Sequence, residues 1–280
     1  MIVSNFLRRS FLTLLLSLFV TGVFAQEQPA KAQYEPHVGQ EGKDVVWVPT
    51  PQALVDRMLG LAKLTPKDYL MDLGSGDGRT VITAVKRGAR ATGIEYNPDM
   101  VELSKRNAAK EGVGDKAEFI RGDIFETDFS KATVITLFLL PDLNIKLRPR
   151  ILDMKPGTRV VSNSFTMGEW KSDQTVTATA TEGCTSYCTA YLWVVPAKVV
   201  GTWKLADGEL TLRQDFQMLA GTLKSGGNSA SISNGRLNGE QISFTAAGAQ
   251  YTGRVNGNSI EGSVKSAGNS GKWSATRAGK

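Results

Sequence analysis

Three glycines alternate with other residues in the stretch MDLGSGDGRT, residues 71–80. Asp72 lies in the short apolar run that precedes Gly74, Gly76 and Gly78, and a helix-like pattern follows. Glycine lets the backbone approach a ligand closely and adopt strained dihedral angles. The free N–H groups at the start of a helix can bind a carboxylate or a phosphate. The stretch therefore predicts a ligand-binding loop between a strand and a helix, where open α/β sheets bind ligands.

The glycine spacing is G-x-G-x-G, and Arg79 stands where a dinucleotide-binding loop would place its third glycine. This spacing disfavours a nicotinamide oxidoreductase. Two further carboxylates follow the next two predicted strands, Glu95 in GIEYNP and Asp123 in RGDIF. Together these residues predict a site at the carboxyl edge of a parallel sheet.

The pattern over residues 44–195 resembles the class I S-adenosylmethionine-dependent methyltransferases, whose motif I is G-x-G-x-G after an acidic residue. The resemblance implies that Glu95 accepts hydrogen bonds from both ribose hydroxyls and that Asp123 contacts the adenine amine. Tyr96 is expected to cover one face of the adenine or ribose. The alternatives are solvated acids at Asp72 and Glu95, a turn cap at Asp123 and simple packing of Tyr96. The expected cofactor-binding residues are Thr50, Asp72, Gly74, Ser75, Gly76, Gly78, Glu95, Tyr96 and Asp123.

A closer resemblance covers VWVPTPQALVDRML together with DLGSGDGR. These segments are similar to the small protein-lysine methyltransferases that act on mitochondrial membrane proteins, and to their bacterial relatives. In that group the Pro-Thr-Pro segment precedes a helix that covers the cofactor, which implies the contact at Thr50. The sequence FLLP at residues 138–141 differs from the N-P-P-[FY] motif, and this disfavours methylation of DNA amines or glutamine.

Alternating strand and helix patterns predict a mostly parallel sheet covered on both faces, the Rossmann-like seven-stranded methyltransferase sheet that the resemblance implies. Thr50 is the expected N-cap of the first helix, with Pro51 in its first turn. Further helices are expected at residues 80–87, 97–111 and 143–152. The expected strands are residues 69–73, 89–95, 117–120, 132–139 and 158–163, followed by a hairpin of residues 175–181 and 187–195.

The composition changes near Pro196: 14 of the 29 glycines lie beyond residue 200, and no proline does. Asn-Gly pairs begin at Asn234, Asn238 and Asn256, and such pairs favour two-residue hairpin turns. The region predicts a small all-β meander, either a barrel or a sandwich, with Trp203 and Trp273 in its core. The expected organisation is therefore a methyltransferase domain at residues 44–196 and an all-β domain at residues 197–280.

The N-terminus predicts export. Arg8 and Arg9 precede an apolar run, and Val23-Phe24-Ala25 fits a signal-peptidase site, so residues 1–25 are an expected signal peptide. A general-secretion signal is favoured over a twin-arginine signal, and an uncut membrane anchor is the alternative. An irregular segment, residues 26–43, follows. The expected location is the periplasm or the exterior, with no membrane anchor after cleavage.

Charge, cysteine and histidine content limit the ligands and partners that the chain is expected to bind. Removing residues 1–25 lowers the net charge from +6 to +4, and residues 26–200 hold 22 basic and 22 acidic residues, so no nucleic-acid partner is expected. Cys184 and Cys188 are a possible disulfide in an exported chain. No metal site is expected, and a single histidine, His37, argues against histidine-dependent catalysis.

These observations predict a methyltransferase that uses S-adenosylmethionine, with a protein lysine as the first expected acceptor. The alternatives are a small-molecule or envelope-component acceptor, and a non-catalytic exported binding protein that uses its β domain on an envelope component. No catalytic residue is assigned, because desolvation and bulk water can deprotonate lysine. The expected acceptor pocket is lined by Leu139, Leu140, Pro141, Asn163, Ser164 and Phe165.

Overall fold

A computed structural model describes residues 33–279 of the chain. The expected signal peptide, residues 1–25, and residues 26–32 of the expected irregular segment lie outside the described residues. Residues 33–49 form no helix and contain an isolated bridge between Glu41 and Val46. Within residues 33–279, no helix combines the length and the apolar composition needed to cross a membrane.

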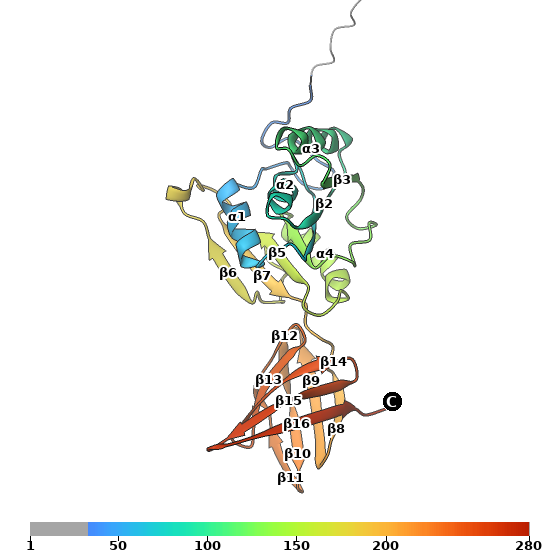
Figure 1. Cartoon of the computed structure of the whole chain (residues 1–280), viewed down its shortest axis with the longest axis vertical. Coiled ribbons are helices and arrows are strands. Elements are labelled where there is room, and N and C mark those ends of the chain that lie inside the picture. The colour runs from blue at the N-terminus through green and yellow to red at the C-terminus, as the bar shows by residue number, and fades with distance from the viewer. Residues whose placement is uncertain (1–32, 280) are drawn as a thin grey trace, which may run out of the picture. The chain divides into compact units, whose positions relative to one another are not determined.

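The first half of the described chain forms a seven-stranded sheet, which confirms the expected methyltransferase fold (Figure 1). Its spatial order is β3-β2-β1-β4-β5-β7-β6. The first five strands in this order, β3, β2, β1, β4 and β5, are parallel to one another. β7 pairs antiparallel with both β5 and β6. The strands are β1 (Tyr69–Leu73), β2 (Arg90–Glu95), β3 (Ala117–Arg121), β4 (Val134–Leu137), β5 (Arg159–Asn163), β6 (Gln174–Thr177) and β7 (Thr189–Val194).

The helices are α1 (Gln52–Leu61), α2 (Arg79–Lys86), α3 (Pro98–Lys110) and α4 (Pro141–Leu152), with a short 3-10 helix η1 (Ala180–Glu182). The expected cap at Thr50 is wrong, because Pro51 is the N-cap residue and its side chain cannot accept a hydrogen bond. α3 begins as expected, since the Asn97 side chain accepts a hydrogen bond from the Asp99 N–H. α4 begins two residues before the expected position, at a proline whose fixed φ suits a first helical turn.

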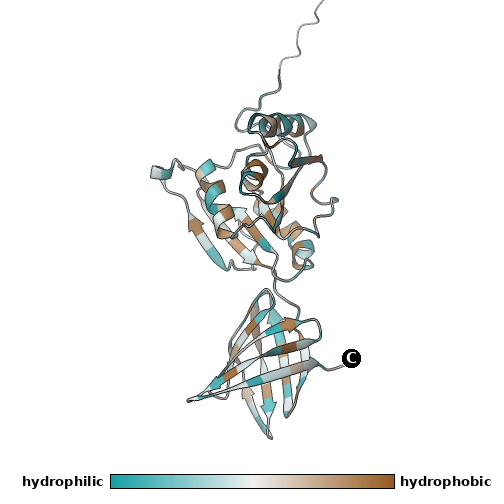
Figure 2. Cartoon of the chain, viewed as in Figure 1, coloured by the Kyte–Doolittle hydropathy of each residue, from teal (hydrophilic) through white to brown (hydrophobic). Residues whose placement is uncertain are grey.

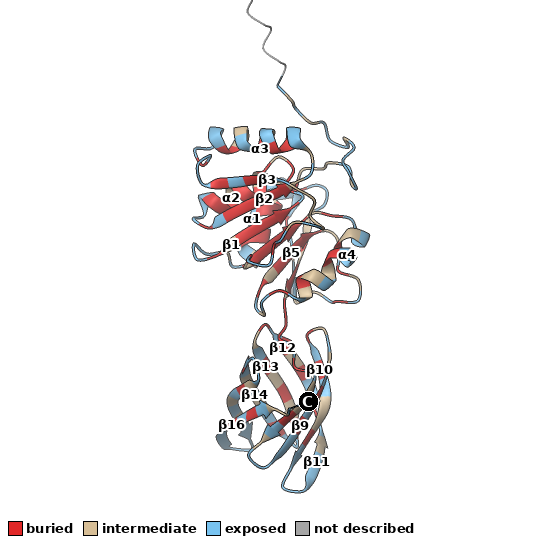
Figure 3. Cartoon of the chain, turned by 90° about the vertical axis from the view of Figure 1, so that its right-hand side faces the viewer, coloured by how far each residue is buried: buried red, intermediate tan, exposed pale blue. Residues whose placement is uncertain are grey.

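Alternating residues of the buried strands pack on the two faces of the sheet. On one face, Leu70 and Val134 pack in a cluster with side chains of α1, α2 and α3. On the other face, Ile135 and Leu137 pack in a second cluster with Leu147 of α4. Figure 2 shows the resulting apolar strands, and Figure 3 shows α3 buried on one face and exposed on the other. Because both faces are covered, polar ligands must enter at the edge where the strands end.

The second half of the described chain forms an antiparallel sheet in which β9 pairs with both β8 and β10, so that the sheet closes into a barrel. This closure decides between the expected barrel and sandwich. Trp203, Phe244 and Trp273 are buried inside it. The strands are β8 (Gly201–Leu205), β9 (Gly208–Asp215), β10 (Met218–Ser225), β11 (Asn228–Ser231), β12 (Ser233–Asn238), β13 (Gln241–Ala246), β14 (Ala249–Asn256), β15 (Ser259–Ser266) and β16 (Asn269–Arg277).

The Asn-Gly pairs take different positions from those expected. In two pairs the asparagine is the last residue of a strand, and Gly239 or Gly257 is the first residue of the two-residue turn. Both glycines have positive φ, 61° and 56°. The third expected turn is wrong: Asn234 lies inside β12 with φ 50°, at an irregularity in the β12–β13 pairing.

Candidate active site

A cavity of about 540 Å³ lies at the carboxyl ends of the parallel strands. This volume is within the range of small-molecule sites. The loop after β1 contributes to its lining, as do residues that follow β2, β3, β4 and β5. Among the expected cofactor-binding residues, the cavity lining contains Thr50, Asp72, Gly74, Ser75, Gly76, Glu95, Tyr96 and Asp123.

The glycine loop is held against the end of β2. The N–H groups of Gly74 and Ser75 both donate to the Ile94 carbonyl, and the Gly76 N–H donates to Glu95 Oε2 at 2.9 Å. Gly76 has φ 55°, and a Cβ atom there would lie 2.8 Å from Nε1 of Trp47. The loop therefore needs glycine both for its backbone conformation and for the close approach of Trp47.

Gly78 lies outside the cavity lining. Its φ is 83°, and a Cβ atom there would lie 2.7 Å from the Phe119 ring and 2.9 Å from Ser104 Cβ. The residue is the N-cap of α2. The sequence pattern predicted a cofactor contact at Gly78, whereas its position explains the glycine by packing of the loop against β3 and α3.

Asp72 is a buried carboxylate inside the cavity, with 6% of its surface exposed. Burial raises its pKa to about 7, the hydrogen bond from Thr136 Oγ1 opposes that rise, and the charges of Glu95 and Asp77 add to it. The Thr136 bond measures 2.6 Å. The environment therefore disfavours the charged form of Asp72, and a cation bound beside it would restore that form.

Glu95 is fixed by two backbone donors. Its Oε2 accepts from Gly76 N–H at 2.9 Å and its Oε1 accepts from Asn97 N–H at 3.0 Å. A carboxylate oxygen has a further lone pair beyond the one used here. Neighbouring Tyr96 is 49% exposed beside the cavity. Glu95 and Tyr96 therefore both line the cavity at the end of β2, and their contacts with ribose and adenine stay a prediction.

Lys43 occupies the end of the cavity at which the adenine contacts are expected. Its ammonium donates to the Asp123 carboxylate and lies 4.7 Å from the centre of the Tyr96 ring. The hydrogen bond from Lys43 and the one from the Phe125 N–H lower the pKa of Asp123. Lys43 is missing from the residues expected at the site, because no local pattern shows that residues 40–47 return to the cavity.

Thr50 is buried although it does not cap α1. Its hydroxyl accepts a hydrogen bond from Asn163 Nδ2 at 3.3 Å, and its carbonyl accepts one from Arg79 Nη1 at 2.9 Å. Arg79 is itself paired with Asp77. The Pro-Thr-Pro segment is thus joined to the glycine loop through Arg79 and to the end of β5 through Asn163.

The expected acceptor residues divide into two groups. Leu139, Leu140 and Phe165 line the cavity, whereas Pro141, Asn163 and Ser164 are outside its lining. Asn163 is fully buried, and its Oδ1 accepts a hydrogen bond from Ser164 Oγ at 2.8 Å, so these two residues support the site from behind. Phe138 and Tyr187 also line the cavity, although neither is among the expected acceptor residues.

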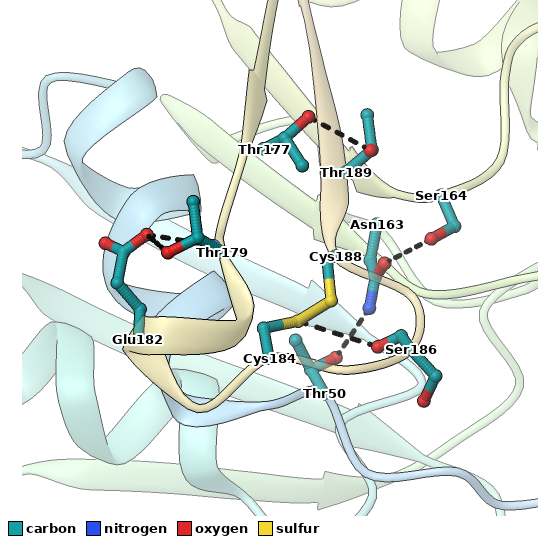
Figure 4. Close-up of a disulfide and its surroundings, with 10 residues drawn as sticks. All are labelled: Thr50, Asn163, Ser164, Thr177, Thr179, Glu182, Cys184, Ser186, Cys188 and Thr189. Atoms are coloured by element: carbon teal, nitrogen blue, oxygen red, sulfur yellow. Dashed lines mark hydrogen bonds between the residues drawn. A yellow bond between two sulfur atoms is a disulfide. The ribbon is translucent and has the colours of Figure 1, made fainter.

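Cys184 and Cys188 form a disulfide, which confirms the expected pairing (Figure 4). It closes the loop between β6 and β7. Figure 4 shows Thr50 and the bonded pair Asn163 and Ser164 beside this disulfide. The disulfide therefore closes the loop that carries Tyr187, and it lies next to the polar residues that support the cavity.

Comparisons with known proteins agree with this geometry. The ANTKMT methyltransferase domain matches residues 72–174. A protein-lysine N-methyltransferase of Saccharolobus islandicus is 39% identical over 165 residues, which are 58% of this chain and 96% of the relative. An adenine nucleotide translocase lysine N-methyltransferase of Mus musculus is 32% identical over 42% of this chain and 52% of its own length.

A solved structure is also similar. It is an RNA methyltransferase of Salinibacter ruber in complex with S-adenosyl-L-homocysteine, with 49% identity and a TM-score of 0.50. The match covers 54% of this chain and 96% of that chain. The family model matches within the region of the seven-stranded sheet, and each of these matches leaves part of the chain uncovered.

The residues of the cavity fit S-adenosylmethionine. Its ribose hydroxyls and adenine amine are hydrogen-bond donors and its sulfonium and ammonium are cationic, and the lining presents the carboxylates of Asp72, Glu95 and Asp123 as acceptors. The chain therefore belongs to the same methyltransferase family as the Saccharolobus islandicus protein and is an S-adenosylmethionine-dependent methyltransferase.

Proposed function

We propose that the chain methylates the side-chain amine of lysine in a protein. The observation that carries this proposal is the Saccharolobus islandicus relative, a protein-lysine N-methyltransferase that matches over 96% of its own length. The adenine nucleotide translocase lysine N-methyltransferase of Mus musculus is similar as well. The cavity supports the proposal because it extends from the carboxylates of Asp72, Glu95 and Asp123 to an apolar end at Leu139 and Phe165.

The bound cofactor supplies a methyl group that its sulfonium already activates, so the protein mainly aligns the reactants. In this proposal Glu95 binds the ribose, Asp123 binds the adenine, and Asp72 lies beside the cationic end of the cofactor. A lysine ammonium must lose its proton before it can attack. The apolar end of the cavity lowers the pKa of a lysine that enters it, because desolvation disfavours the charged form.

A direct test incubates the full chain with S-adenosylmethionine that carries a tritiated methyl group, together with protein or RNA from the cell that encodes it. Label recovered as methyllysine after hydrolysis of the protein supports the proposal. Label in an RNA nucleoside would show that the acceptor is RNA and not lysine. RNA is the acceptor class for which the Salinibacter ruber protein is named. Label in neither fraction, from a chain that binds the cofactor, would contradict both acceptors. The Glu95→Ala variant is the background control.

We also propose that the chain works outside the cytoplasm. The support is the predicted signal sequence at residues 1–25 together with the disulfide, because disulfides persist in oxidising compartments. N-terminal sequencing of the protein isolated from its own cell tests this. A chain that begins at Gln26 in the envelope fraction supports export, and an intact Met1 in the cytosol contradicts it.

A further inference from the structure

Three aromatic rings form a continuous wall at the apolar end of the cavity. The ring centres of Phe138 and Tyr187 lie 5.2 Å apart in an edge-to-face arrangement. Phe165 lies 6.1 Å from Phe138 and 6.3 Å from Tyr187. All three residues line the same cavity as the carboxylates of Asp72 and Glu95. We refer to these three residues as the aromatic wall.

The order of the strands places the aromatic wall beyond the glycine loop. The sheet runs β3-β2-β1-β4-β5-β7, and the expected adenine and ribose contacts follow β3 and β2. The glycine loop follows β1, in the middle. Phe138 follows β4, Phe165 follows β5, and Tyr187 precedes β7. A cofactor that extends from Asp123 across the glycine loop would therefore direct its reactive end toward the aromatic wall.

Tyr187 is presented by a firmly held loop, residues 178–188. The disulfide joins Cys184 to Cys188, the residue after Tyr187, and Cys184 is buried in the core. The Ala178 N–H donates to the Cys188 carbonyl at 2.8 Å. Near its other end, Glu182 accepts hydrogen bonds from Thr179 and pairs with Arg57 of α1. Tyr187 is 45% exposed although the loop that carries it is fixed at several points.

The backbone at two positions departs from ordinary conformations to build this wall. Tyr187 has φ 53° and Ser164, the residue before Phe165, has φ 58°. Left-handed conformations are costly for residues other than glycine and gather at functional sites. The Ser164 conformation is held by its N–H, which donates to the Thr189 carbonyl at 2.7 Å. Both strained residues thus belong to the junction between β5 and the disulfide-closed loop.

The faces of aromatic rings attract alkylammonium cations. The rings of the wall pack against one another, so a cation would lie over the exposed face of Tyr187 and beside Phe165 rather than between the rings. We infer that the disulfide-closed loop is part of the acceptor site, and that Tyr187 with Phe138 and Phe165 binds the aliphatic stem of the acceptor lysine and, after methyl transfer, its methylated ammonium group. This inference rests on the proposed lysine acceptor and adds the residues that select it.

The test measures binding of a small probe to the full chain saturated with S-adenosylhomocysteine, by nuclear magnetic resonance titration. The probe is Nα-acetyl-Nε-trimethyllysine amide, and its matched control carries an uncharged tert-butyl group in place of trimethylammonium. The wild-type chain should bind the cationic probe about fivefold more tightly than the uncharged one, as expected for a cation over partly exposed rings. Tyr187→Leu should lose this preference, and Tyr187→Phe should keep it because the ring remains.

The disulfide provides a second variant. Cys184→Ser combined with Cys188→Ser should weaken probe binding about as much as Tyr187→Leu, while the affinity for S-adenosylhomocysteine stays within twofold in every variant. Equal binding of both probes by a wild-type chain that binds S-adenosylhomocysteine would overturn the inference and leave the lysine proposal standing. Charge preference that survives Tyr187→Leu would overturn the role of Tyr187. Failure of the wild-type chain to bind S-adenosylhomocysteine would instead contradict the proposed function itself.

Discussion

The two sheets of this chain use their interiors in opposite ways. The parallel strands of the seven-stranded sheet are covered on both faces, and the carboxylates of Asp72 and Glu95 lie at the edge where these strands end. The antiparallel sheet of residues 201–277 closes on itself and fills its interior with apolar side chains, aliphatic and aromatic. Trp203 and Phe244 in that interior are 0% and 1% exposed.

This difference explains where a ligand can bind. Parallel strands end together, so each following loop adds a residue to one edge. A small closed barrel places alternate residues of every strand inside, where packing uses the available space. Function in the first region therefore depends on residues at strand ends, whereas the second region can present a ligand only its outer surface and turns.

Exchange of one tryptophan in each region should give the largest contrast. Trp203→Ala removes a fully buried ring whose Nε1 donates to the Val199 carbonyl, and it should lower the free energy of unfolding of the barrel by about 3–5 kcal/mol. Cofactor affinity should stay within twofold. Trp47→Ala, the matched change at the cavity, should weaken cofactor binding and leave the free energy of unfolding of the barrel unchanged. Chemical denaturation and calorimetric titration measure both quantities, and loss of cofactor binding in folded Trp203→Ala would break the contrast.

The pH dependence of Asp72 should give the next largest effect. Because its folded pKa is raised to about 7 from 3.8, the folded chain holds a proton between those values that the unfolded chain has lost. This group therefore costs increasing stability as the pH rises through that window, by up to about 4 kcal/mol. Asp72→Asn, whose side-chain carbonyl can still accept from Thr136, should stabilise the ligand-free chain more at pH 8 than at pH 4.

Thermal unfolding at the two pH values checks this expectation. Cofactor affinity of the wild-type chain should also rise with pH through about 7, because a cationic ligand favours the ionised carboxylate. That pH dependence should flatten in Asp72→Asn. Equal stabilisation by the variant at pH 4 and pH 8 would show that burial does not perturb Asp72.

Gly78→Ala should separate backbone strain from steric overlap. A Cβ atom would meet the Phe119 ring at 2.7 Å in addition to the strain of φ 83°, so the loss of stability should be about 1–3 kcal/mol, with weaker cofactor binding. Gly112→Ala is the matched control, since its φ is 69° but a Cβ atom there meets nothing within 4 Å. Equal losses in the two variants, measured by denaturation, would rule out the packing role of Gly78.

Lys43→Ala should have the smallest effect. The exposed Lys43 contacts Asp123 and Tyr96, which the adenine is expected to use, so its removal should tighten cofactor binding by about fivefold at most. Lys105→Ala, which breaks an exposed pair with Glu102 on α3, should leave the affinity unchanged. Weaker binding by Lys43→Ala would instead make Lys43 a cofactor contact.

Much of the site could be predicted because it follows strand ends. The buried strands appear in the sequence as apolar runs, and their ends identify Asp72, Glu95 and Asp123. The spacing of its glycines identifies the glycine loop. Thr50 lines the cavity, where the resemblance implied a cofactor contact, whereas the separate expectation that it caps α1 is wrong, since its hydroxyl bonds Asn163.

Residues that reach the cavity from distant loops could not be predicted. Lys43 and Trp47 arrive from a segment without periodic structure, and Tyr187 from a loop whose path depends on the disulfide and on Arg57. The expected strand at residues 132–139 is longer than the observed β4 (Val134–Leu137). Leu139 is buried because it lines the cavity, and it does not belong to the strand. Tertiary packing decides these positions, and no local pattern encodes it.

Assignment of the cavity to the cofactor is tested most directly by calorimetric titration of S-adenosylmethionine into the wild-type chain, Glu95→Ala and the exposed control Glu102→Ala. We expect micromolar binding at one site, at least tenfold weaker binding by Glu95→Ala because two backbone donors lose their acceptor, and no change in Glu102→Ala. A folded wild-type chain that does not bind, or a Glu95→Ala variant that binds as tightly as the wild type, would contradict this assignment.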